Sequence, residues 1–248
     1  MSLAQLYLEL IHFQSSPVRK KKSAALFNAT PCSVGRLAYA EVIGNLLRYL
    51  HDQGCLSAVT YDLKGSLAVE GEDDEEVFVA KDNLLTVSED FLARLEEIAA
   101  DRVIYKTVAL RNGNELRLNR QIEWVDREGT SHKIGPDLSA FSSSEVFTWG
   151  GELKGGADPA GSDEHWKTAT RAFERILSAV DKTGRPIPKL SFIATILVDR
   201  VAREAALWIQ QGKLTSVYNL TQIADSIEKR RAFLSDLAGF LGCGERYL

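Results

Sequence analysis

The stretch that decides the fold is GELKGGADPAGSDEHWKT, residues 151–168. It continues an apolar and aromatic run, 146–153, whose composition predicts a strand, and then passes through a glycine-rich turn. Ser162 is a capping residue and predicts the start of a long helix with one apolar face. The apolar positions of that face are Trp166, Ala169, Phe173, Ile176, Leu177 and Val180. A strand, a turn and a long helix in this order indicate a layered α/β fold.

The segments on either side extend this pattern. Downstream, 190–198 is apolar at consecutive positions, which predicts a central strand buried on both faces. Upstream, Asp126-Arg127-Glu128-Gly129 predicts a tight turn, followed by a return strand at Lys133–Phe141 that contains Gly135-Pro136-Asp137. The other expected elements are a strand from Asn114, a strand at 214–219, and helices at 199–211 and 221–241. Residues 114–241 thus predict the order β-β-β-α-β-α-β-α.

The first part of the chain carries mostly helical signals. Apolar spacing predicts a short helix at 3–13 and a stronger one at 34–53, which Gly54 should end. Ser88 predicts the start of another helix, and 56–61 is a plausible strand.

A block of like charge interrupts these signals. Residues 70–76 hold six carboxylates in seven positions, and such a block repels itself and stays solvated as a flexible insert. We therefore expect a mainly helical N-terminal region, 1–113, that contains this insert, and an α/β core, 114–248, the two forming one compact domain. The expected fold class is α/β, with a central mixed β-sheet flanked by helices and a helical N-terminal region.

The net charge of the whole chain argues against binding to nucleic acid, but the charge is unevenly distributed along the sequence. The 248 residues include 30 Lys+Arg and 34 Asp+Glu, a net charge of -4. Without the six carboxylates of 70–76, the count becomes 30 cations against 28 anions. Residues 167–248 carry 13 Lys+Arg against 8 Asp+Glu, so the C-terminal third is basic enough to face DNA.

Cysteines and apolar runs indicate the compartment. Cys32, Cys55 and Cys243 are an odd number, widely spaced and without a C-x-x-C pair, which predicts free thiols and no zinc ribbon. The longest apolar runs fall well short of the roughly 20 residues that a membrane helix requires, and the first residues do not resemble a signal peptide. We therefore expect a cytoplasmic protein without membrane association.

Two carboxylates and a lysine form the candidate site. Asp137 lies on the predicted return strand, and Glu152 and Lys154, two residues apart on the next strand, share one of its faces. Adjacent antiparallel strands can bring the three together, and paired carboxylates suit Mg²⁺ with bound substrate phosphate. The simpler alternative is a turn residue and an exposed ion pair. The chain also holds a second triplet, Asp62-Leu63-Lys64, but that triplet lacks a Pro-Asp partner.

At these residues the chain resembles a known family. Pro136-Asp137 followed by Glu152-Leu153-Lys154 resembles the PD-(D/E)XK nuclease signature, and 151–168 is similar to the active-site block of type II restriction endonucleases of the AvaI/BsoBI kind and of XcyI-like relatives. The resemblance implies a PD-(D/E)XK fold core. It also implies that Asp137 and Glu152 bind the metal and that Lys154 is catalytic.

Further site residues follow from the same resemblance. His165 matches a histidine expected near the scissile phosphate, where a neutral imidazole accepts a proton from water; a surface position in the first helical turn is the alternative. Asp158 matches a position expected near the bases, although Asp before Pro is also an ordinary turn former. Glu41 is a candidate additional metal ligand, with plain solvent exposure as the alternative.

Basic residues in two places are candidate DNA contacts. Lys182, Arg185 and Lys189 cluster around a proline-stiffened loop. Arg19, Lys20, Lys21 and Lys22 form a run of four cations that could track a phosphate strand or form an ordinary solvated loop.

The leading functional hypothesis is a Mg²⁺-dependent type II restriction endonuclease that hydrolyses phosphodiesters in double-stranded DNA at a specific site and leaves 5′-phosphates. A palindromic site implies a two-fold homodimer, and such a system also contains a cognate DNA methyltransferase. Two alternatives stay open: a structure-specific repair or recombination nuclease of the same fold, and a DNA-binding module without turnover. The common nucleotide-binding, serine hydrolase and zinc protease motifs are absent from the sequence.

Overall fold

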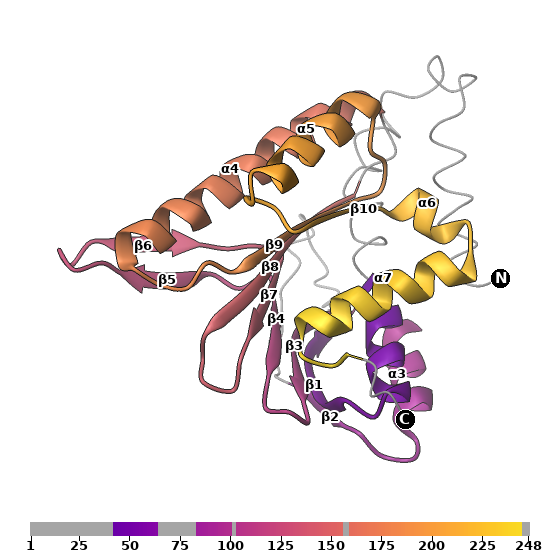
Figure 1. Ribbon diagram of the computed structural model, residues 1–248. Coiled ribbons are helices and arrows are strands. Elements are labelled where there is room, and N and C mark those ends of the chain that lie inside the picture. The colour runs from indigo at the N-terminus through magenta and orange to yellow at the C-terminus, as the bar shows by residue number, and fades with distance from the viewer. Residues whose placement is uncertain (1–41, 64–82, 101–102, 156–158, 245–248) are drawn as a thin grey trace, which may run out of the picture.

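A computed structural model describes residues 42–63, 83–100, 103–155 and 159–244 (Figure 1). Its centre is an eight-stranded sheet with the order β10-β9-β8-β7-β4-β3-β1-β2. The bounds are β1 Leu56–Leu63, β2 Asn83–Thr86, β3 Val103–Leu110, β4 Glu115–Leu118, β7 Leu138–Phe141, β8 Phe147–Lys154, β9 Lys189–Ala194 and β10 Ser216–Asn219. The β8–β9 and β9–β10 pairs are parallel and the other pairs are antiparallel, so the predicted mixed sheet is confirmed.

Helices cover both faces of this sheet (Figure 1). The helices are 42–52, α3 Phe91–Ala100, α4 Pro159–Thr183, α5 Asp199–Gln210, α6 Leu220–Ala224 and α7 Ile227–Phe240. Side chains alternate between the two faces along each strand. On β9, Phe192 packs with α4 and α5, whereas Ile193 packs with the core that contains α7, α3 and helix 42–52. The predicted burial of this strand on both faces is therefore correct.

The predicted return strand at 133–141 is wrong as a single element. It is divided into β6, Ser131–Ile134, and β7, with Gly135-Pro136-Asp137 between them. Pro136 lacks an N–H and cannot continue a ladder, so the chain changes sheets at this point. β6 pairs with β5, Ile122–Val125, in a separate two-stranded arm.

The tight turn of this arm lies where the sequence predicts it. The Oδ1 of Asp126 accepts hydrogen bonds from the backbone N–H groups of Glu128 and Thr130, both at 2.9 Å. Gly129 has a φ of +83°, which favours glycine. We call the β5–β6 hairpin the arm.

Two predicted helix boundaries differ from the structure. α4 begins at Pro159 and not at Ser162, because proline is well suited to the first helical turn. Ser162 lies inside the helix, and its hydroxyl donates to the carbonyl oxygen of Ile196 at 3.4 Å. The helix predicted at 221–241 is two helices, because Ser226 caps α7 by accepting from the N–H of Lys229 at 3.1 Å.

The N-terminal region contributes strands as well as helices. Helix 42–52 falls within the expected helix 34–53 and ends before Gly54, whose φ is +65°. The expected boundary at 113/114 falls in the loop between β3 and β4, two strands that pair directly. The structure thus joins this region to the rest of the sheet through β1, β2 and β3. The predicted helix 3–13 and the acidic insert 70–76 lie outside the described residues.

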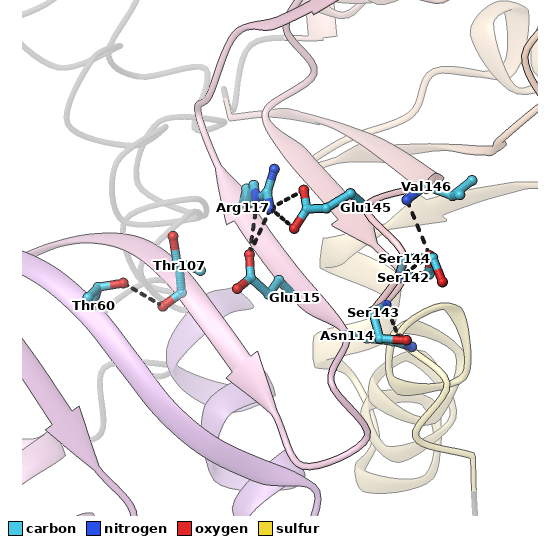
Figure 2. Close-up of polar contacts among 10 residues, drawn as sticks. All are labelled: Thr60, Thr107, Asn114, Glu115, Arg117, Ser142, Ser143, Ser144, Glu145 and Val146. Carbon is cyan, nitrogen blue, oxygen red and sulfur yellow. Dashed lines mark hydrogen bonds and ion pairs between the residues drawn. The ribbon is translucent and has the colours of Figure 1, made fainter.

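Polar contacts hold the β7–β8 hairpin at one end of the sheet (Figure 2). Arg117 of β4 forms ion pairs with Oε2 of Glu145 at 2.6 Å and with Oε2 of Glu115 at 3.0 Å. The side chain of Asn114 accepts a hydrogen bond from the N–H of Ser143 at 3.1 Å. Glu145 has a positive φ of 59°, and its two hydrogen bonds to Arg117 help to hold this unusual backbone conformation. These contacts join the β7–β8 loop to β4.

Cys55 and Cys243 are free thiols, as expected, and Cys32 lies outside the described residues. No helix within the described residues combines the length and apolar character that crossing a bilayer requires.

Candidate active site

The register of β7 and β8 brings Asp137 and Glu152 together. Leu138 pairs with Gly151 in an antiparallel ladder, so the residues next to them, Asp137 and Glu152, lie opposite each other where these two central strands meet at one end. The Oδ2 of Asp137 accepts a hydrogen bond from the N–H of Leu153 at 2.8 Å. One carboxylate is therefore fixed by the backbone of the strand that carries the other.

Lys154 connects the two carboxylates. Its Nζ lies 2.7 Å from Oε2 of Glu152 and 3.3 Å from Oδ2 of Asp137. The Glu152 side chain is 4% exposed, and those of Asp137 and Lys154 are 27% and 20% exposed. The structure thus brings together the three residues that the sequence singled out. The ion pair between Lys154 and Glu152 is not an exposed one, because the Glu152 side chain is buried.

Burial and like charge change the electrostatics of Glu152. Desolvation and the nearby Asp137 carboxylate raise its pKa to about 7, although Lys154 opposes the shift. Burial by itself would lower the pKa of Lys154, but the Asp137 and Glu152 carboxylates outweigh that effect and raise it. Lys154 is therefore a cation at neutral pH, whereas burial and the nearby Asp137 make the negative charge of Glu152 costly in the metal-free protein.

The side chains at this end of β7 and β8 fit a divalent cation that prefers oxygen ligands. Asp137 and Glu152 supply two carboxylates, and Mg²⁺ is commonly bound by one or two carboxylates, with water and phosphate oxygens completing its coordination. Within the described residues, no group of three or more His, Cys, Asp or Glu side chains forms a fuller metal cage. The raised pKa of Glu152 is also consistent with this fit, because a bound cation stabilises its ionised form.

His165 lies in the N-terminal part of α4, partly buried near Lys154. Desolvation and the positive charge of Lys154 lower its pKa, while Glu164 has a smaller opposite effect. Its imidazole is therefore neutral at pH 7 and able to accept a proton.

Asp163, two residues earlier, has a structural role that the sequence did not reveal. Its Oδ1 lies 2.7 Å from Nη2 of Arg200 and so links α4 to α5.

The structure separates the three cations predicted around the loop after α4. Lys182 lies in the last turn of α4. The guanidinium of Arg185 lies 5.2 Å from the ring centre of Trp124 on the arm, and the Nζ of Lys189 lies 5.6 Å from that of Phe240 on α7. Lys189 begins β9, five residues before Ala194, the partner of Lys154, which corresponds to about 17 Å of strand.

Other candidate site residues lie outside the described part of the chain. These are Glu41, Asp158, Arg19, Lys20, Lys21 and Lys22. The second triplet is described only in part, because Lys64 also lies outside. Its Asp62 pairs with Lys106 of β3, whose Nζ lies 2.6 Å from Oδ2 of Asp62.

One group of cations, on α4 and the arm, was not among the residues predicted from the sequence. A cavity of about 460 Å³ lies between α4 and the arm, and Lys133, Arg171 and Arg175 help to line it. The signal that could have found the arginines is their spacing of four residues, which puts both on one side of a helix.

Comparison with known proteins finds one matching family model and several similar proteins. Residues 134–234 match the family model of restriction endonuclease BsobI. The type II restriction enzymes AvaI of Nostoc sp. and of Anabaena variabilis are each 42% identical over 86 residues, which are 35% of this chain and 27% of each relative. BsoBI of Geobacillus stearothermophilus is 47% identical over 72 residues, which are 29% of this chain and 22% of the relative.

The matched segments span about a quarter of the length of these curated relatives. The family model covers β7, β8, α4, β9 and the elements up to the first half of α7. Over residues 134–234, which carry Asp137, Glu152 and Lys154, this chain is thus related to the type II restriction endonucleases of the AvaI/BsoBI kind, as its sequence motif predicted.

Proposed function

We propose that this protein is a Mg²⁺-dependent type II restriction endonuclease that hydrolyses phosphodiester bonds in double-stranded DNA at a specific site and leaves 5′-phosphates. The observation that carries the proposal is the position of Lys154 Nζ, 2.7 Å from Glu152 and 3.3 Å from Asp137, within a segment similar to restriction enzymes. The two carboxylates provide a site for a metal cation, and the lysine beside them provides a second positive charge that stabilises the phosphate in the transition state.

Asp137 and Glu152 would hold the Mg²⁺. When bound, the ion supplies Lewis acidity toward the phosphoryl oxygens and the leaving oxygen. Lys154 orients the attacking water and offsets the negative charge that develops on the phosphate in the transition state. His165 is neutral at pH 7 and accepts the proton that the water releases. The backbone hydrogen bond from Leu153 holds Asp137 in place while the charges change.

Recognition of a palindromic site requires two copies of this site related by two-fold symmetry. We therefore propose a homodimer, one active site for each DNA strand. Asp158 is proposed to accept a hydrogen bond from a base such as cytosine, and Lys182, Arg185, Lys189 and Arg19–Lys22 are proposed to contact DNA. In this role the protein acts in the cytoplasm together with a cognate DNA methyltransferase that protects the host sites.

Digestion of a sequenced phage genome with the purified protein and Mg²⁺ tests the proposal. The expected result is a set of discrete fragments whose mapped ends share one sequence and carry 5′-phosphates. The matched control is Glu152→Gln, which removes one ligand charge and should produce no fragments. Cleavage confined to junctions, flaps or ends would instead indicate a repair or recombination nuclease. Binding of DNA without any cleavage would leave only a DNA-binding module.

A further inference from the structure

The cavity between α4 and the arm is the strongest feature that the proposed chemistry does not use. It has a volume of about 460 Å³ and is lined by β6 on one side and by the second half of α4 on the other. Figure 1 shows the arm lying alongside α4. We call this cavity the arm groove.

The charged side chains of the arm groove are mainly cations. Lys133, Arg171 and Arg175 are exposed on its walls, and Glu174 is the one carboxylate in the lining that the structure describes. No ion pair within the described residues involves any of the three cations. By contrast, Arg117 and Arg200 are each held by two carboxylates. The groove therefore presents positive charge that no ion pair among the described residues neutralises, although the whole chain is acidic.

The walls of the arm groove are held in place by contacts on the arm. The Nε2 of His132 lies 2.8 Å from Oδ2 of Asp126, so this histidine is paired with the turn of the arm. Ile134 is buried in the same core as Ile176 and Ala179 of α4. Arg185 lies over the ring of Trp124 and adds a contact from the loop after α4. A cation on such a wall loses little freedom of the backbone when it binds an anion.

The residues of the arm groove lie close to the candidate active site along the chain. The arm is inserted immediately before Asp137, and Lys133 is four residues from that carboxylate in the chain. On α4, Arg171 and Arg175 are six and ten residues beyond His165, which corresponds to about 9 and 15 Å along the helix axis. At about 100° per residue, Arg175 lies about 80° and Arg171 about 120° around the helix from His165, so both lie beside the face of α4 that carries His165 and not on it. Along the helix axis, the two arginines thus lie within about 15 Å of His165.

We infer that the arm groove binds the sugar-phosphate backbone of double-stranded DNA beside the point of cleavage, with Arg171, Arg175 and Lys133 as phosphate contacts. The inference rests on the proposed nuclease function and adds the path of the DNA to it. The distance of about 15 Å along the helix axis from His165 to Arg175 corresponds to roughly four base pairs of duplex. These residues would therefore contact the DNA beside the cut site. Guanidinium groups bind phosphate oxygens in a bidentate way, and two of them one helical turn apart fit an extended chain of phosphates. Such contacts are independent of base sequence.

A DNA-binding measurement that does not require cleavage tests this inference. The variants are Arg171→Gln/Arg175→Gln and, as a matched control, Arg203→Gln, which removes an exposed arginine of α5 outside the groove. The probe is a short fluorescein-labelled duplex of random sequence in Ca²⁺, followed by fluorescence anisotropy over a range of salt concentrations. Thermal unfolding of each variant verifies that it is folded.

The expected result is DNA affinity about 100-fold lower for the double variant, from about tenfold for each charged contact. The slope of log affinity against log salt should become less steep by about 1.8, since each phosphate contact contributes about 0.9. Arg203→Gln should bind like the wild type. Equal affinity and equal slope for the folded double variant and the wild type would overturn the inference.

The binding measurement distinguishes a failure of this inference from a failure of the proposed nuclease function. If the wild type cleaves DNA and the double variant binds like the wild type, the nuclease proposal stands and the arm groove is not a DNA contact. If the wild type does not cleave DNA but the double variant loses binding, the groove contact stands and the nuclease proposal fails.

Discussion

The ammonium of Lys154 lies 2.7 Å from Oε2 of Glu152, a side chain that is only 4% exposed. A carboxylate at such a position loses most of its hydration and needs compensating positive charge. Lys154 provides part of that charge, yet the pKa of Glu152 is still raised to about 7. The Mg²⁺ that we propose for this site would supply further positive charge beside Glu152.

Lys154→Gln tests the catalytic role of the lysine. The substitution keeps a hydrogen-bond donor but removes the positive charge, so we expect the cleavage rate at saturating Mg²⁺ to fall by about 10²- to 10³-fold. DNA affinity in Ca²⁺ should fall by no more than about tenfold, the effect of one charged contact. Single-turnover cleavage and fluorescence anisotropy measure the two quantities. The control is Lys167→Gln, which removes a lysine that is 57% exposed on α4. A folded Lys154→Gln protein with the cleavage rate of the wild type would remove Lys154 from the mechanism.

The raised pKa of Glu152 predicts how the stability of the metal-free protein depends on pH. The carboxyl takes up a proton more readily when folded, with a pKa of about 7 against 4.5 in the unfolded chain. The folded state therefore binds more protons, so its stability is highest below pH 4.5 for this group and is lost as pH rises through 7. We expect this loss to be on the order of 2 kcal/mol and to be absent in Glu152→Gln. Urea unfolding between pH 5 and pH 8 in EDTA measures it.

Metal addition completes this test. At pH 8, Mg²⁺ should raise the unfolding midpoint of the wild type, because it binds the folded state, and should have little effect on Glu152→Gln. Glu96→Gln, which removes a carboxylate that is 68% exposed, is the control and should behave like the wild type. Equal Mg²⁺ stabilisation of wild type and Glu152→Gln would place the ion elsewhere.

His165→Asn tests the proton acceptor. We expect about a 10²-fold lower cleavage rate above pH 6.5, because asparagine cannot take up the proton. Since burial and Lys154 lower the pKa of His165, the imidazole stays neutral down to pH values below its ordinary 6.5. The ratio of wild-type to variant rates should therefore be constant from pH 8 to pH 6.5 and decrease only below that range. A pH series of single-turnover rates measures this ratio. A ratio that decreases above pH 7 would contradict the assignment.

The central part of the fold could be predicted because its signals are local. The strand that ends at Lys154, α4 and β9 each show their own apolar period, and two strands joined by a short loop are usually neighbours. The proximity of Asp137 to Glu152 followed from that rule. The residue-by-residue pairing of β7 with β8 did not follow from it. That ladder contains a register shift between Ala140 and Phe141, and its loop is held by a contact between Arg117 and Glu145, which lie 28 positions apart in the chain.

The arm and the N-terminal strands could not be predicted in the same way. Alternation of apolar residues does not say to which sheet a strand belongs, so the change of sheet at Pro136 was missed even though proline was the visible sign. β1 pairs with β3 across a long segment, with Thr60 opposite Thr107, and such non-local pairing has no local signature. The arm groove depends on both the arm and α4, and for that reason its cations were not recognised from the sequence.

Gly151→Ala tests how closely β8 must pack for the site to form. A Cβ at Gly151 would lie 2.8 Å from Cη2 of Trp149 and 3.3 Å from Cδ1 of Leu138. The Trp149 ring cannot move easily, because it stacks on Phe240 at 5.4 Å and its Nε1 donates to the hydroxyl of Ser191 at 2.8 Å. The strand must therefore shift next to Glu152, and we expect a loss of about 1–3 kcal/mol in the free energy of unfolding.

Cleavage by Gly151→Ala should fall more than this loss of stability explains, because a misplaced Glu152 alters the geometry of the site. The matched control is Gly239→Ala on α7, where a Cβ meets nothing within 4 Å and alanine favours the helix by up to about 1 kcal/mol. Urea unfolding and single-turnover cleavage at a temperature where both variants are folded measure the two effects. If Gly151→Ala matches Gly239→Ala in both stability and cleavage, the close packing of β8 on Trp149 does not set the position of Glu152.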